Sequence, residues 1–272
     1  MAAQRSFTEY VKKRFDNNFW AAAESYLDAN LDSLGIELKR IHRAGETEIS
    51  DVKVEHVWVE DKPGMEIHFD VAVSIWFETH EGDYHYDDYD ENIVWMMAHC
   101  RGDLDKNLDD FEILNVLKYN GKSRVKAPMD DALVPVINKN QLDDAAEQFL
   151  REHYKKALLE PMWVDPKELA EGMGLTIRYE NITKDGSIFG RSFFYDCETE
   201  LYDEDADAMY KVTIPAKTIL VDKKTAFLMV LGATNNTIVH ECVHWDKHKK
   251  AFALARLYDN ELSNIGQADR KS

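Results

Sequence analysis

The chain has 272 residues, of which 44% are hydrophobic, and it carries 51 acidic against 33 basic residues for a net charge of −18. Nucleic acid and anionic membrane surfaces repel so acidic a protein, which argues against direct binding to either. Because no apolar run is long enough to cross a bilayer and the N-terminal residues lack a secretory signal, we expect a cytoplasmic protein.

The length and an uneven charge distribution predict two domains. Residues 1–130 carry 27 acidic against 15 basic residues, so most of the net charge lies there. A polar segment without periodicity follows, in which Gly121, Pro128 and Pro135 interrupt regular structure. We therefore expect an N-terminal α+β module over residues 1–130, which recognises a substrate or a partner, and a second domain over residues 137–272.

The N-terminal module begins with a predicted helix. Residues 7–34 carry apolar side chains at intervals of three and four, which predicts one long amphipathic helix. Apolar and polar residues then alternate, which predicts strands at 36–41, 52–59, 65–77, 92–100 and 111–119. A helix followed by a meander of strands favours an antiparallel sheet covered on one face, the order of cystatin-like folds. The acidic stretch 83–91 lacks the pattern of a calcium loop, so we interpret it as solvated.

The second half alternates helices and strands. Residues 143–159 have helical periodicity, and Asp165 is placed to cap a short helix that starts at Pro166. Strands are predicted at 175–179, 187–195 and 209–221, with a solvated acidic loop at 203–207 between the last two.

One motif in this half is typical of zinc sites: His240-Glu241-x-x-His244, in a helix predicted to start at residues 234–236. Residues four apart lie one above the other on a helix, so His240 and His244 can both direct a ring nitrogen at one ion. Glu241 lies beside them, where it can take a proton from metal-bound water. A core helix with two packed histidines is the alternative. With Cys242 inside the motif and an odd number of cysteines, we expect reduced thiols.

Residues 143–258 resemble the ImmA/IrrE family of zincin-like metallo-endopeptidases. The matching features are the helix within 164–175, the strand 218–222 and the segment 235–246 that contains the motif. The resemblance implies an α+β, zincin-like hydrolase domain with Zn²⁺ held by His240 and His244. It also implies Glu241 as the general base that activates water against a peptide bond.

The resemblance also implies a protein or peptide substrate such as a helix-turn-helix repressor. In zincins an edge strand above the motif helix holds the substrate as an added strand, and we expect residues 187–193 to form it. The chain would then act on gene regulation without binding DNA itself.

The family normally supplies a third, acidic ligand from a later helix, whereas this chain ends 28 residues after His244. His248 would lie about 12 Å along the helix from His240, too far to share one ion. Neither Glu261 nor Asp269 is favoured by its position, so we expect a metallopeptidase domain that lacks its C-terminal part. A non-catalytic, peptidase-derived binding module with weak or no zinc is the alternative function.

Overall fold

The computed structural model describes residues 5–30, 33–34, 47–81, 88–126, 129–228 and 231–268. It divides into two compact units, one formed by Met1–Val136 with Ala253–Ser272 and the other by Ile137–Phe252. The chain leaves the first unit within the polar segment that suggested a boundary. It then returns to the first unit at Ala253, whereas the sequence pattern places everything from residue 137 onwards in one C-terminal domain.

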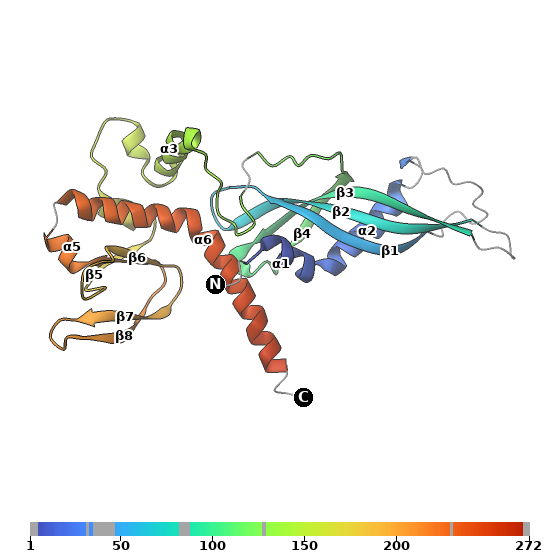
Figure 1. The fold of residues 1–272 in the computed structure, drawn as a ribbon. Helices are drawn as coiled ribbons and strands as arrows, with labels where there is room; N and C mark the ends of the chain where they lie inside the picture. The colour runs from blue at the N-terminus through green and yellow to red at the C-terminus, as the bar shows by residue number, and fades with distance from the viewer. Residues whose placement is uncertain are drawn as a thin grey trace. The chain divides into compact units, whose positions relative to one another are not determined.

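The first unit is a four-stranded antiparallel sheet with two helices on one face (Figure 1). Its sheet order is β1-β2-β3-β4, so each strand pairs with its neighbour in sequence. The elements are α1 (Phe7–Arg14), α2 (Asp16–Asn30), β1 (Thr47–Val59), β2 (Glu66–Glu81), β3 (Asp88–Asp103) and β4 (Glu112–Lys118). The predicted α+β class is therefore confirmed. The strand predicted at 36–41 and most of the acidic stretch 83–91 lie outside the described residues.

The predicted long helix is instead two helices that meet at Phe15. This residue has φ −117° and ψ 18°, outside the helical region, and its ring stacks on Phe111 with centroids 3.8 Å apart. Ser6 caps α1 by accepting from the Glu9 N–H at 3.0 Å. The break lets both helices follow the sheet, and helical periodicity alone does not reveal it because α1 and α2 continue the same apolar spacing.

The core of the first unit lies between the helices and one face of the sheet. Side chains of β2 alternate, so that Phe69, Val71 and Val73 point into the core. The last helix, α6 (Leu231–Ala268), returns to this unit and buries Leu254 and Leu257 in the same core. This contact is the physical reason why residues 253–272 belong with the first unit.

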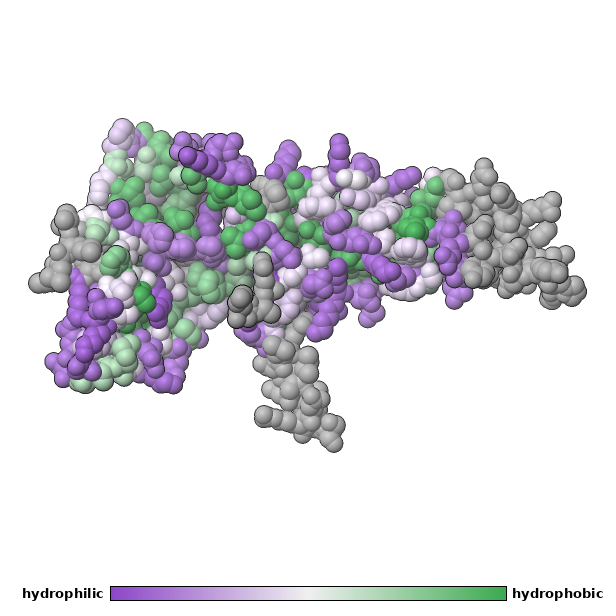
Figure 2. Space-filling view, viewed as in Figure 1, coloured by the Kyte–Doolittle hydropathy of each residue, from purple (hydrophilic) through white to green (hydrophobic). Residues whose placement is uncertain are grey.

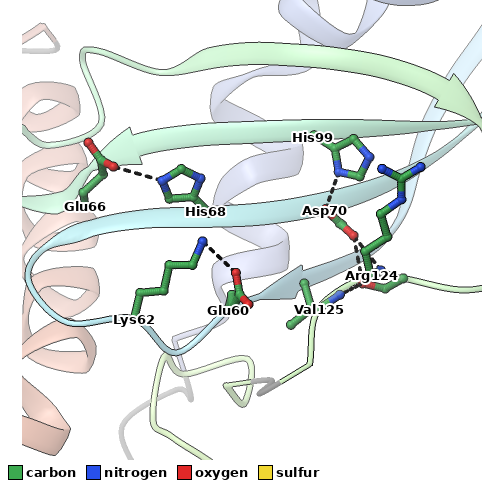
Figure 3. Close-up of polar contacts among 9 residues, drawn as sticks. Glu60, Lys62, Glu66, His68, Asp70, His99, Arg124 and Val125 are labelled. Carbon is green, nitrogen blue, oxygen red and sulfur yellow. Dashed lines mark hydrogen bonds and ion pairs between the residues drawn. The ribbon is translucent and has the colours of Figure 1, made fainter.

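The opposite face of the sheet carries a buried carboxylate (Figure 3). Asp70 on β2 accepts hydrogen bonds from His99 Nδ1 at 2.6 Å, Ser123 Oγ at 2.9 Å and the Arg124 backbone N–H at 3.0 Å. The side chain of Asp70 is only 9% exposed, so these three donors replace the water that it loses. The carboxylate thereby holds the segment after β4 against the sheet.

We predict that Asp70→Ala destabilises the first unit by about 2–3 kcal/mol, because the substitution removes a buried carboxylate and leaves three part-buried hydrogen-bond donors without their acceptor. Urea unfolding followed by tryptophan fluorescence measures the change. Asp109→Ala is the matched control, since Asp109 is 67% exposed and pairs with Arg14 at the surface. That variant is expected to change the free energy of unfolding by less than about 0.5 kcal/mol. Equal effects of the two substitutions would show that Asp70 does not hold the segment after β4 against the sheet.

The second unit combines a small mixed sheet, a separate hairpin and surrounding helices (Figure 1). The sheet has the order β5-β9-β6, with β5 parallel and β6 antiparallel to β9, and β7 pairs with β8. The elements are α3 (Leu142–His153), a 3-10 turn (Lys155–Leu158), α4 (Pro166–Gly172), β5 (Thr176–Glu180), β6 (Gly190–Phe193), β7 (Cys197–Asp203), β8 (Ala208–Ile214), β9 (Thr218–Asp222) and α5 (Lys223–Leu228).

The cap at Asp165 is confirmed, since its side chain accepts from the backbone N–H groups of Lys167 and Glu168. The predicted strand 209–221 is wrong as a single element, because the chain turns at Pro215 and at Lys217, which has φ 59°. Strand β7 has no counterpart in the prediction, since its alternation is weak and few of its side chains are buried.

Helix α6 begins at Leu231, earlier than the predicted start at residues 234–236. Among the helices that the described residues form, none is both long and apolar enough to cross a membrane.

Candidate metal and substrate site

Helix α6 presents the two motif histidines on the side away from the core of the second unit. Ile238 and Cys242 are buried against α3, α4, β5 and β9. His240 is exposed and His244 is half-buried on the other side of the helix. Their Nε2 atoms converge to 2.9 Å. Exposure of His240 contradicts the alternative of two histidines packed in a core.

The histidine pair fits the donor geometry of a zinc site. Zinc binds imidazole nitrogens at about 2.0–2.1 Å with tetrahedral angles, which places two such nitrogens about 3.3 Å apart. The observed separation of 2.9 Å is somewhat shorter, because the two rings are hydrogen-bonded to each other. Each neutral imidazole can present one lone pair, so both rings can bind the same ion.

The described residues do not supply an obvious third ligand for this pair. The ring of His248 stacks on that of His244 with centroids 5.1 Å apart. Asp269 and the side chain of Glu261, both weighed from the sequence, lie outside the described residues.

Glu241 faces strand β6 at the edge of the sheet. Its Oε2 accepts a hydrogen bond from Ser192 Oγ at 2.6 Å, and the side chain is almost fully buried. A Cβ atom at Gly190 would lie 3.0 Å from Glu241 Oε1 and 2.8 Å from Thr237 Cγ2, so only glycine lets the strand approach this closely. Strand and carboxylate are therefore in direct contact.

Aromatic side chains pack the end of β6 against helix α6. The ring of Phe194, directly after β6, lies between Trp245 and Phe252, with centroid distances of 4.7 and 3.9 Å. These parallel stacks fix the distance between the strand and α6. The position of Ser192 over Glu241 thus follows from packing at both ends of the strand.

The backbone of β6 alternates between β9 and a free edge, which pairs with no other strand of the described residues. The Asp222 N–H donates to the Phe189 carbonyl at 2.9 Å. Hydrogen-bonded pairs recur at every second residue of an antiparallel ladder, so Arg191 directs its backbone groups to β9. Gly190 and Ser192 direct theirs to the free edge, next to Glu241.

A second group of ligand-type side chains lies between α3 and α6. Within the described part of the chain, the ligand atoms of three residues lie within 4.8 Å of one another: Glu152, His153 and Asp246. Asp246 accepts from His153 Nε2 and Lys249 Nζ, each at 3.1 Å, and Lys247 Nζ lies 3.0 Å from its other oxygen.

The Asp246 carboxylate is already paired with the ammonium groups of Lys247 and Lys249 and hydrogen-bonded to His153. Burial by itself would raise the pKa of Asp246, but the His153 hydrogen bond and the charges of Lys249 and Lys247 hold that pKa well below its usual range. A metal ion would have to displace both ammonium groups from the same oxygen atoms. We therefore interpret this group as a link that holds α3 against α6.

The buried thiol of Cys242, which follows Glu241 in the sequence, is unreactive. Burial, with a smaller contribution from the Glu241 charge, raises the pKa of Cys242 to about 12, and burial also raises the pKa of Cys100. Because the thiolate is the reactive form, neither group is reactive near neutral pH.

We predict that a disulfide-exchange reagent labels only the exposed Cys197 in the folded protein and labels all three cysteines in denaturant. Absorbance of the released thiolate counts the reactive groups, and Cys197→Ser should leave almost none. Rapid labelling of two or more thiols in the native protein would contradict the burial of Cys100 and Cys242.

The structure joins residues that the sequence pattern leaves apart. Ser192 lies within the predicted edge strand 187–193, but no sequence signal connects it to Glu241, which follows 49 residues later. The same holds for His153 and Asp246, 93 residues apart. The histidines of the motif were found because their spacing is local.

No protein-family model matches the chain, and no curated protein matches it either. Among solved structures, the chain is similar to an Ntf2-like protein involved in plasmid conjugation, with 8% sequence identity and a TM-score of 0.19; the match covers 64% of this chain and 75% of that one. A TM-score this low supports no argument about fold or function. The comparisons thus assign the chain to no family, and its α+β class rests on the helices and sheets themselves.

Proposed function

We propose that the second unit is a zinc-dependent endopeptidase of the ImmA/IrrE type with a zincin-like site. The observation that carries this proposal is the convergence of His240 and His244 Nε2 at 2.9 Å on the same helix turn as Glu241. Three residues of one helix then supply two zinc ligands and a group that moves protons. Such an arrangement serves hydrolysis of a peptide bond.

Zinc, when bound, would lower the pKa of a water molecule and polarise a carbonyl group. Glu241 would accept the proton of that water and pass it to the leaving amine, because its carboxylate is not needed as a ligand. Ser192 would orient the carboxylate through its hydrogen bond to Oε2. The free edge at Gly190 and Ser192 would hold the substrate as an added strand, which brings a backbone carbonyl close to Glu241.

The substrate we propose is a protein, such as a helix-turn-helix repressor in the cytoplasm. The first unit, with its excess of carboxylates, would contribute to choosing it through electrostatic complementarity. Direct contact with nucleic acid or with a membrane forms no part of the proposed function, since the net charge of −18 opposes both.

A peptidase-derived binding module without catalysis is the second candidate. It is favoured by the absence of a third ligand beside His240 and His244 among the described residues, where the one three-residue ligand group is Glu152, His153 and Asp246. Glu241 is also held beneath β6 rather than open to solvent. In this alternative β6 would bind an extended peptide without cleaving it.

Metal content decides between the two candidates. We expect about one zinc per chain by elemental analysis in protein purified without chelator or added metal. The double variant His240→Ala/His244→Ala should lose it, whereas His68→Ala, a control on β2 in the first unit, should retain it. Absence of zinc from folded wild-type protein would contradict the first candidate and favour the binding module.

A further inference from the structure

A cavity of about 440 Å³ lies beside β6 in the second unit. Most of its lining comes from three strands: Arg191 of β6, Glu198, Thr199 and Glu200 of β7, and Met209 and Lys211 of β8; Ile182 and Thr183 between β5 and β6 complete it. Hydrophilic side chains gather over the β7–β8 hairpin in Figure 2, at the lower left. A polar ligand therefore suits this cavity better than an apolar one.

Arg191 is the half-buried charge of the cavity. Its Nη1 donates to Thr199 Oγ1 at 2.9 Å, and within the described residues it forms no ion pair. Lys211, by contrast, is paired with Glu198 at 2.8 Å. Glu200 is exposed, where water screens its charge.

A half-buried guanidinium that forms no ion pair with a carboxylate of the described residues is unusual in a chain with 18 more acidic than basic residues. Four of its five N–H donors have no partner among the described residues, and the planar group matches a carboxylate through two parallel hydrogen bonds. The unmet donors of Arg191 thus point to an anionic ligand group that enters the cavity from outside the chain.

Strand register connects this cavity to the edge beside Glu241. Gly190 and Ser192 direct their side-chain positions to α6, so Arg191 between them faces the other side of the sheet. The side chains of a peptide paired with the free edge of β6 would alternate between the same two sides of the sheet. Its residue opposite Arg191 would share the cavity side, and its two neighbours would face Glu241.

We propose that the cavity around Arg191 is a specificity subsite for an acidic side chain of an extended peptide bound along β6. The recognised chemistry is a carboxylate one residue away from the backbone that faces Glu241. This inference rests on the proposed function for its orientation of the peptide. The subsite requires that the peptide binds but not that it is hydrolysed, so an experiment can disprove the subsite and the proposed endopeptidase activity separately.

The test titrates ¹⁵N-labelled wild-type protein with N-acetyl-Ala-Glu-Ala-amide and with the neutral N-acetyl-Ala-Gln-Ala-amide. Backbone amide chemical shifts in ¹H–¹⁵N correlation spectra report binding. The acidic peptide should shift the amides of Gly190, Arg191 and Ser192 and bind about tenfold more tightly than the neutral one. Arg191→Gln should remove this preference. Arg178→Gln on β5, whose guanidinium already pairs with Glu180, is the matched control and should keep it.

Equal affinities for the two peptides, shifts away from β6 and the cavity, or no binding at the solubility limit of the acidic peptide would each overturn the subsite. Arg191→Lys retains the charge without the planar fork and should show an intermediate preference, which keeps the test decisive if Arg191→Gln fails to fold. Peptide signals in the same samples report hydrolysis. If the acidic peptide binds at β6 but no peptide is hydrolysed, the subsite is supported and the proposed endopeptidase activity is contradicted. If peptides are hydrolysed without preference for the acidic one, the endopeptidase activity is supported and the subsite is contradicted.

Discussion

The Glu241→Gln variant is expected to hold as much zinc as the wild type while its peptide hydrolysis falls about 10²- to 10⁴-fold in kcat/KM. The amide keeps the shape of the side chain and can still accept from Ser192 Oγ, which lies 2.6 Å from Oε2 in the wild type. It cannot accept the proton of water. Elemental analysis and cleavage of a quenched fluorescent peptide library measure the two quantities on the same preparation.

Glu152→Gln is the matched control, because it makes the same chemical change on α3 within the same unit. We expect this variant to retain both zinc and hydrolysis. Loss of zinc from it would place the metal at Glu152, His153 and Asp246 instead. Equal cleavage by wild-type protein and Glu241→Gln would show that Glu241 is not the base.

Leu254→Ala is expected to lower the free energy of unfolding of the first unit by about 2–5 kcal/mol. Leu254 is 1% exposed in a core made mainly by α1, α2 and the four-stranded sheet, although it lies on the last helix of the chain. The substitution leaves a cavity that rigid neighbours fill only in part. Urea unfolding by tryptophan fluorescence suits the measurement, since four of six tryptophans lie in this unit.

Leu114→Ala removes the same atoms from β4 of the same unit at a site that is 48% exposed. We expect this control to cost less than about 1 kcal/mol. Comparable losses for the two variants would mean that the end of α6 does not pack in the first unit. That result would restore the simpler division at residue 137.

Local periodicity was sufficient for much of the fold. Strands β1 to β4 could be recognised from alternation, because their apolar side chains at every second position face one core. The cap at Asp165 was likewise readable, since the capping side chain bonds to residues two and three positions later. Periodicity failed where the chain turned without changing its pattern, as at Phe15 and Pro215.

The motif on α6 shows the same limit at the candidate site. His240, Glu241 and His244 could be grouped from sequence because a helix brings residues four apart together whatever surrounds it. The contact between Glu241 and Ser192, the position of Arg191 at the cavity and the return of Leu254 to the first core could not. Each joins segments far apart in the chain, and only packing of side chains against one another in the folded protein selects those pairings.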